Sequence, residues 1–94
     1  IGTLYYQKHE NRDLLQKKYS YFAETVRRQL LIDVDDEESR RENITQLALR
    51  TGMPEAEVRM ILDKVKRYIE ADTTLPDRRL QETIDGLDTI INNL

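Results

Sequence analysis

The sequence has no cysteine and no tryptophan, and it has only one histidine, three glycines and two prolines among its 94 residues. Without cysteine the chain forms neither a disulfide framework nor a thiolate metal site, and a reducing compartment is its natural setting. No apolar run approaches the 18 residues of a membrane span, and no signal segment opens the chain. The chain starts with Ile1 rather than methionine, which suggests a piece of a longer protein.

Groups that could carry catalysis or hold a metal are equally scarce. His9 is the only histidine, and Ser20 and Ser39 are the only serines. The sequence therefore offers no evident pair of a catalytic nucleophile and a general base. The acidic stretch 33–38 begins like a calcium loop, but it lacks the glycine that the sharp turn of such a loop needs. The three glycines are isolated, which excludes a glycine-rich phosphate loop. We therefore predict a non-enzymatic domain with no catalytic residue, no metal, no cofactor and no small-molecule substrate.

What the sequence does contain is helical periodicity. Apolar residues make up 38% of the chain and charged residues 35%, and the apolar ones recur at spacings of three and four. This pattern predicts an all-α fold, a four-helix single domain. The predicted helices span about residues 11–31, 40–50, 54–70 and 75–93.

Helix-start signals accompany three of these segments. Asn11 or Asp13 is suited to cap the first helix, and Thr74 precedes the fourth. Ser39 with Glu42 three residues later is the signature of a capping box, in which each side chain accepts a backbone N–H of the first turn. The apolar face of the first helix then consists of Leu15, Tyr19, Phe22, Val26 and Leu30.

A helix-turn-helix-like unit from Leu47 to Leu62 is the sharpest signal. Ala48 lets two helices approach, Gly52 four residues later ends the first helix in the left-handed conformation, and Val58 wedges the second helix against the first. Pro54 suits the first turn of the second helix because its φ angle is already helical.

The same unit invites a second interpretation, a helix-turn-helix DNA-binding domain that uses the helix from Pro54. Residues near the start of that helix would have to meet bases and phosphates. Here they include Glu55 and Glu57, whose carboxylates oppose binding to a polyanion, and only Arg59 favours it. We keep DNA binding as the alternative to protein binding and consider nucleic acid the less favoured partner.

Charge and apolar patterning favour an unknown protein as the partner. The formal charge is +3 over residues 1–30 and −3 over residues 71–94, so the first helix is basic and the last is acidic. An apolar stripe repeats along the last helix and ends at Leu94. The candidate interaction surface is formed by Leu80, Ile84, Leu87 and Ile91 of that stripe and by Glu55, Glu57 and Arg59.

Five of the six aromatic residues lie in the first quarter of the chain. They are Tyr5, Tyr6, Tyr19, Tyr21 and Phe22. Beside Lys17 and Lys18 they could form a stacking surface for single-stranded nucleic acid. The interpretation that we prefer is that they belong to the core of the first helix, with hydroxyl groups at its rim.

Several short motifs also carry a family resemblance. They are Leu4-Tyr5-Tyr6-Gln7, Lys17-Lys18 with Tyr21-Phe22, Leu47-Ala48 with Thr51-Gly52, and Glu57-Val58. Over about residues 1–70 the chain resembles the soluble C-terminal helical tail of a family of uncharacterised bacterial membrane proteins, whose genes often lie near those of MoxR-type ATPases. The resemblance implies that a membrane span lies shortly before Ile1, that the tail contacts the membrane only through the parent chain, and that it faces the cytoplasm at the bacterial inner membrane.

Overall fold

The computed structural model describes residues 2–71 and 75–94, with side chains for residues 11–71 and 75–94. Within these residues the chain forms four helices and no strand: α1 (Gly2–Leu30), α2 (Arg40–Thr51), α3 (Glu55–Glu70) and α4 (Asp77–Asn92). The predicted all-α, four-helix fold is confirmed.

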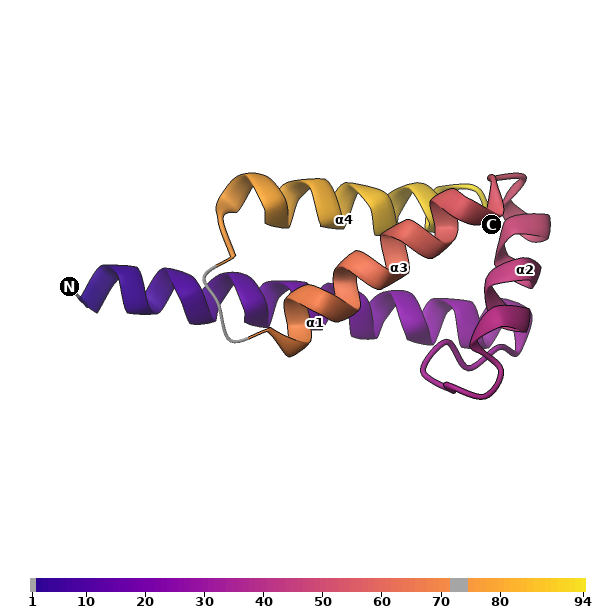
Figure 1. Ribbon diagram of the computed structural model, residues 1–94, viewed down its shortest axis with the longest axis horizontal. Coiled ribbons are helices and arrows are strands. Elements are labelled where there is room, and N and C mark those ends of the chain that lie inside the picture. Colours follow the sequence, from indigo (N-terminus) through magenta and orange to yellow (C-terminus); the bar gives the residue numbers. More distant parts are fainter. Residues whose placement is uncertain (1, 72–74) are drawn as a thin grey trace.

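Three of the helices form a bundle, and α2 closes one end of it. Helices α1 and α4 lie side by side and run in the same direction, whereas α3 crosses the front of the pair in the opposite direction (Figure 1). Helix α2 lies across the end at which α1 and α4 finish, and it packs mainly on α3. The molecule measures 46 × 23 × 22 Å, and its long axis follows α1.

The core lies between the three bundle helices and under α2. Phe22, Leu15 and Val26 of α1 are completely buried, as predicted from their spacing. The connections also contribute, because Val34 and Leu75 are buried. The remaining core side chains are Ile44, Leu47, Val58, Ile61, Leu62, Val65, Leu80, Leu87 and Ile90.

The predicted start of the first helix is wrong. Helix α1 begins at Gly2, so Asn11 and Asp13 lie inside the helix and do not cap it, and His9 does not precede it. The polar stretch 7–13 resembles a break, but glutamine, lysine, glutamate and arginine are good helix formers. The stretch therefore continues the helix, and the first turns of α1 extend beyond the other helices (Figure 1).

The capping signals are correct in position and only partly correct in mechanism. Ser39 is the N-cap of α2, but its side chain makes no capping hydrogen bond, because its backbone angles (φ −96°, ψ 6°) do not aim the hydroxyl at the first turn. Pro54 precedes α3 directly instead of occupying its first turn, and Pro76 precedes α4 in the same way. The proposed cap Thr74 lies outside the described residues.

The turn between α2 and α3 has the predicted chemistry. Gly52 has a φ of 73°, and its N–H donates to the Ala48 carbonyl at 2.9 Å, which ends α2. Val58 is completely buried in the core, and Ala48 packs at the edge of the core. The helix-turn-helix-like unit from Leu47 to Leu62 is therefore present in the structure.

Helix α4 is rotated slightly from its predicted orientation. Its buried face consists of Leu80, Thr83, Leu87 and Ile90, whereas Ile84, Ile91 and Leu94 are only partly buried. Gly86 determines how close α4 comes to α3, because a Cβ atom at this position would lie 3.1 Å from both γ carbons of Ile61.

Leu31 ends α1 in an unfavourable way. Its φ is 58°, a left-handed conformation that costs a leucine free energy, and its side chain is 87% exposed. Leu31→Gly is therefore expected to raise the free energy of unfolding by about 0.5–1 kcal/mol, as measured by urea denaturation. Leu31→Ala is the matched control, because alanine keeps the Cβ atom and should give no such gain. Equal stability of the two variants would contradict this explanation.

Candidate interaction surface

The predicted apolar stripe of α4 is mostly inside the protein. Leu87 is 1% exposed and Leu80 is 8% exposed, so neither side chain is available to a partner of the folded domain. Ile84 and Ile91 pack at the edge of the core and remain partly exposed. The stripe joins α4 to α1 and α3, and only this edge of it belongs to the surface.

A hydrogen-bonded contact fixes how α1 and α4 lie against each other. The Asn11 side-chain amide donates to the Leu75 carbonyl and to Asp77 Oδ1, both at 2.7 Å. The next residue, Arg12, donates to the Ile69 carbonyl of α3 at 2.8 Å. Successive residues of a helix point about 100° apart, so the Asn11 edge of α1 borders α4 and the Arg12 edge borders α3.

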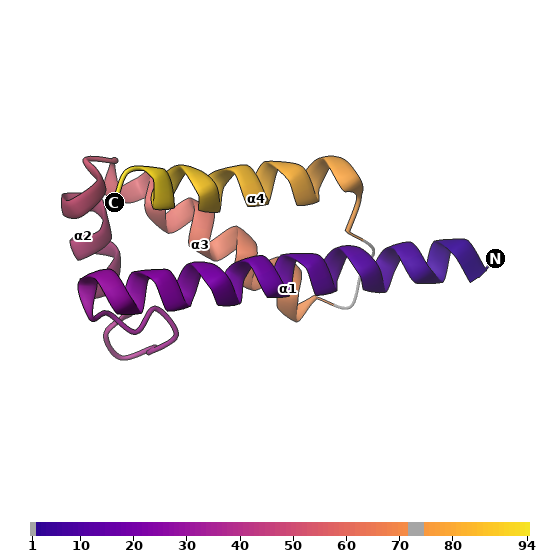
Figure 2. The same ribbon diagram turned by 180° about the vertical axis from the view of Figure 1, so that it is seen from behind.

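Two stripes of side chains begin at this contact and follow the border between α1 and α4. At spacings of three and four, Leu14, Lys18 and Tyr21 follow Asn11 on α1. On α4, the residues that follow Asp77 at the same spacings are Gln81, Ile84, Asp88 and Ile91. We refer to these seven side chains as the outer seam. Arg12 on α1 and Gly86 on α4 face α3 from the opposite edges of these helices, so the spacing places the outer seam on the side that faces away from α3. No described helix crosses that side of the α1 and α4 pair (Figure 2).

The outer seam combines apolar surface with both signs of charge. Leu14 is 43% exposed and Tyr21 is 61% exposed, although both are large apolar side chains. Across the border, Ile84 and Ile91 extend the apolar surface onto α4. Lys18 has no ion-pair partner among the described side chains, and neither does Asp88.

The predicted acidic residues of α3 are partly structural. Glu55 accepts hydrogen bonds from the Thr45 hydroxyl of α2 at 3.0 Å and from the Arg59 guanidinium at 3.4 Å. Glu55 thus joins α2 to the start of α3, where a negative charge is also favoured by the helix dipole. Glu57 is exposed and Arg59 is about half exposed. Glu55 and Arg59 therefore lie together beside α2, whereas Glu57, two residues from each of them, points to the other side of α3.

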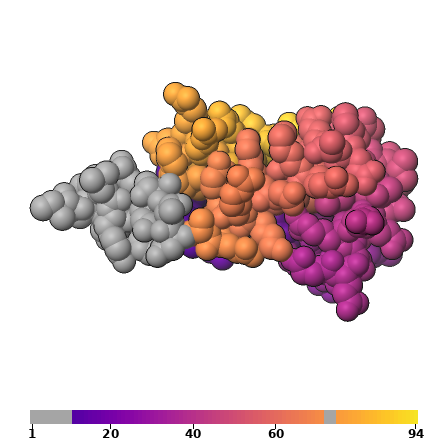
Figure 3. Space-filling view, in the orientation of Figure 1, coloured from indigo at the N-terminus to yellow at the C-terminus, as the bar shows by residue number. Residues whose placement is uncertain are grey.

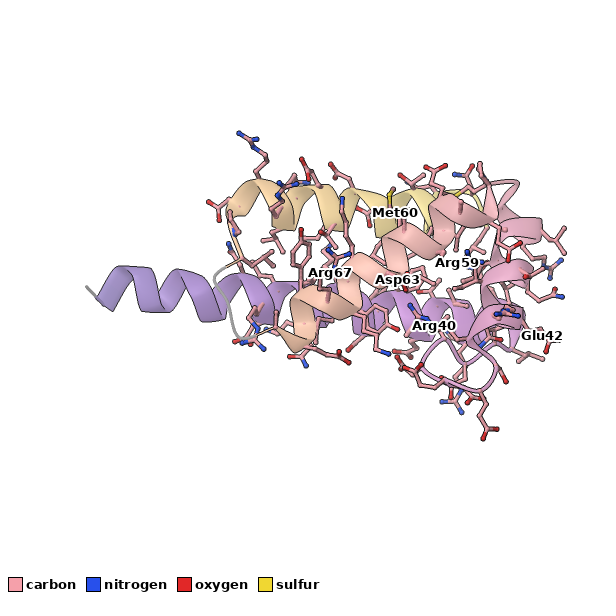
Figure 4. The ribbon with its side chains drawn as sticks, viewed as in Figure 1. Arg40, Glu42, Arg59, Met60, Asp63 and Arg67 are labelled. Carbon is pink, nitrogen blue, oxygen red and sulfur yellow. The ribbon has the colours of Figure 1, made fainter. Side chains whose placement is uncertain are left out.

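We call the side of the molecule that α3 covers the front surface. This surface is close to electrically neutral. The side chains of α3 form its middle (Figure 3), and Arg59, Met60, Asp63 and Arg67 point outward along it (Figure 4). Arg40 of α2 pairs with Asp63 at 2.5 Å. Since acidic partners already hold Arg40 and Arg59, this surface has less free positive charge than its arginine count suggests.

The acidic connection between α1 and α2 is bound to the bundle. Tyr19 donates to Asp35 at 2.8 Å, and Lys66 pairs with Glu37 beside a recess of about 290 Å³. Burial, together with the bond to Asp35, raises the pKa of Tyr19 above its usual range. The Lys66 ammonium lowers the pKa of the exposed Glu37 carboxyl. These contacts give the acidic residues a role in holding the connection in place.

The whole chain, residues 1–94, matches the family model of the DUF4350 C-terminal helical domain. The chain belongs to this family. No curated protein and no solved structure matches it. The family match agrees with the predicted resemblance to the C-terminal helical tail of an uncharacterised family. The resemblance covers about residues 1–70, whereas the family match covers the full chain.

The described part of this DUF4350 C-terminal domain has neither a metal-binding cluster nor a membrane-spanning helix. No group of three or more histidine, cysteine, aspartate or glutamate side chains within it is placed to hold a metal ion. None of its described helices has the length and apolar composition that crossing a membrane requires.

Sequence reasoning missed Leu14, and its preferred assignment of Tyr21 to the core of the first helix is wrong, because that side chain is 61% exposed. A signal for both residues was nevertheless present. They are apolar, yet they lie off the stripe formed by Leu15, Phe22 and Val26, displaced toward a neighbouring edge of the helix. Apolar side chains beside a core stripe make the apolar face of the helix wider than packing against the core requires. The role of Asn11 had no local signal, because its partners are 64 and 66 residues away.

Proposed function

We propose that this domain is a non-catalytic protein-interaction or assembly module that binds another protein through the outer seam. The observation that carries the proposal is the exposure of Leu14 and Tyr21 beside Ile84 and Ile91. Exposed apolar side chains gathered in one place, with charged residues among them, are typical of protein-binding surfaces. Tyrosine is also enriched among the residues that contribute most to binding.

We further propose that the domain is the cytoplasmic part of a membrane-anchored bacterial protein. Two observations support this context. The motifs from Leu4 to Val58 resemble the tail of such membrane proteins, and the matching family is described as a C-terminal helical domain, which implies a longer parent protein. In this arrangement the domain contacts the membrane only through its parent chain.

Site-specific crosslinking of the parent protein in its native cell tests the proposed function. A photoreactive phenylalanine analogue replaces Tyr21 in the outer seam or, as a matched control, Arg67 on the front surface. Protein crosslinks identified by mass spectrometry are expected from position 21 and not from position 67. Crosslinks from position 67 alone, or none from position 21, would refute binding through the outer seam.

The second candidate is DNA binding through α3, which the helix-turn-helix geometry favours. Arg40, Arg41 and Arg59 line a groove of about 540 Å³ between α2 and α3. However, Asp63 pairs with Arg40 and Glu55 pairs with Arg59, so both arginines would have to exchange an acidic partner for a phosphate. The acidic side chains of the groove would also repel the DNA backbone.

We therefore expect the domain to show no measurable affinity for random duplex DNA, even at low salt. Fluorescence anisotropy of a labelled duplex, titrated with the domain at increasing salt concentrations, measures this directly. A phosphate-binding domain would give an affinity that falls steeply with salt. That behaviour, together with a loss of affinity in Arg59→Ala, would replace our proposal with the DNA-binding alternative.

A further inference from the structure

We propose that the partner of the outer seam is the outer seam of a second copy of this chain, in a two-fold symmetric dimer. This inference rests on the proposed function, because it names the partner of the same surface. A two-fold interface uses the same surface on both molecules, so that surface has to be complementary to itself. The outer seam meets this condition in its geometry, its apolar contacts and its charge.

The geometry follows from the contact between Asn11 and Asp77. Both helices run in the same direction from this contact, and each rises about 1.5 Å per residue. Each residue of α1 therefore lies level with the residue of α4 that is 66 positions later in the chain. Lys18 is level with Ile84, and Tyr21 is level with Leu87.

A two-fold axis parallel to the helices, above the border between α1 and α4, relates two such surfaces. Rotation by half a turn about this axis places α1 of each copy over α4 of the other. It keeps the helix directions and the levels along the axis unchanged. The same contact between α1 and α4 then forms twice, as an isologous dimer requires.

The apolar side chains match in this arrangement. Leu14 and Tyr21 of one copy lie over the part of α4 where Ile84 and Ile91 of the other copy are partly exposed. Burying such side chains removes apolar surface from water at both ends of the contact. A tyrosine at this position also keeps its hydroxyl at the polar rim.

The charges match as well. Over its described side chains α1 carries five basic and two acidic residues, whereas α4 carries two basic and four acidic ones. The dimer places the basic helix over the acidic one at both contacts. Lys18 lies about 6 Å along the axis from the level of Asp88, a distance that a lysine side chain spans. Each of these two residues lacks an ion-pair partner among the described side chains of its own chain.

The basic helix α1 and the acidic helix α4 lie side by side, and this arrangement favours a second copy of the chain over other partners. A strongly acidic protein or an anionic membrane would complement α1 but would be repelled by Asp88 and the other carboxylates of α4. A strongly basic protein would complement α4 and be repelled by Lys17 and Lys18. Only a surface with both signs in reverse order matches the outer seam, and the outer seam itself has that order after a two-fold rotation.

Charge reversal tests the dimer on the 94-residue chain. In Lys18→Glu the introduced carboxylate faces Asp88 at both contacts, and in Asp88→Lys the introduced ammonium faces Lys18 at both. Each variant alone is expected to dimerise at least about tenfold more weakly than the wild-type chain.

An equimolar mixture of the two variants is expected to recover dimers, which sedimentation equilibrium measures. One contact of the mixed dimer joins the introduced carboxylate of Lys18→Glu to the introduced ammonium of Asp88→Lys. The other contact joins the two native side chains, Lys18 of one copy and Asp88 of the other. Both contacts therefore pair opposite charges again.

Arg67→Glu is the control, because it makes the same charge change on the front surface and should leave dimerisation unaltered. Circular dichroism verifies that every variant keeps its helical content. A wild-type chain that stays monomeric at all concentrations overturns the dimer, and so does a mixture that recovers no dimers. In either case, crosslinks from position 21 to a different protein would leave the proposed function standing. Failure of both experiments would remove the proposed function too.

Discussion

Leu87→Ala is expected to lower the free energy of unfolding by about 2–5 kcal/mol, the usual cost of truncating a fully buried leucine. The Leu87 side chain lies in the middle of the buried face of α4, among the core residues of the bundle. Its removal loses the transfer free energy of the deleted atoms and leaves a cavity that the neighbouring helices fill only in part. A charged residue at this position would disrupt folding before it could report on a partner.

Urea denaturation of Leu87→Ala and of Leu49→Ala measures this effect with a matched control. Leu49 lies on α2 and is 71% exposed, so the same chemical change should alter stability by no more than about 0.5 kcal/mol. If both variants lost equal stability, the packing of α4 on the bundle would differ from that described above. The predicted α4 stripe would then be open to a partner after all.

Asn11→Ala is expected to cost about 1–3 kcal/mol, because it removes a buried amide and leaves the Leu75 carbonyl without its donor. The same amide also donates to Asp77 in the first turn of α4. Its loss should loosen the start of α4 in particular, where α1 and α4 are aligned. Faster amide hydrogen exchange in the first turns of α4 would show this local effect.

Asn93→Ala is the matched control for this substitution. Asn93 is exposed and its side chain donates to the Thr89 carbonyl of its own helix, so its replacement should change stability by no more than about 0.5 kcal/mol. Thermal or urea denaturation of both variants distinguishes them. Equal costs would mean that the Asn11 contact contributes nothing to the pairing of α1 with α4.

The parts of the fold that local chemistry dictates could be predicted from the sequence. Gly52 is required because the chain enters the left-handed conformation at this position. Ala48 and Val58 occupy the positions at which the two packed helices need a small and a branched side chain. The core face of α1 could likewise be predicted, from the spacing of its apolar residues. These features depend only on residues within a few turns of one another.

The predictions that were wrong concern features that depend on the environment of a helix rather than on its own residues. A polar stretch such as 7–13 is compatible with a loop or with a helix, and its own residues do not decide between the two. A repeat of three and four along α4 likewise leaves open whether Ile90 or Ile91 is buried. The structure buries Ile90 completely and leaves Ile91 at the edge.

The candidate surface was predicted in part. Ile84 and Ile91 belong to the outer seam, whereas Leu80 and Leu87 of the same stripe belong to the core. Which residues of an amphipathic helix remain exposed depends on the angle at which its neighbours approach. That angle is set here by the contact of Asn11 with Leu75 and Asp77, across most of the length of the chain.

The proposed role of the outer seam is tested most directly by nuclear magnetic resonance of the isotope-labelled domain over a dilution series. Backbone amide resonances of Leu14, Lys18 and Tyr21 on α1, and of Ile84 and Asp88 on α4, are expected to shift with protein concentration. Resonances of Arg59 and Arg67 on the front surface should stay unchanged. Shifts confined to α3, or no concentration dependence at any position, would contradict self-association through the outer seam.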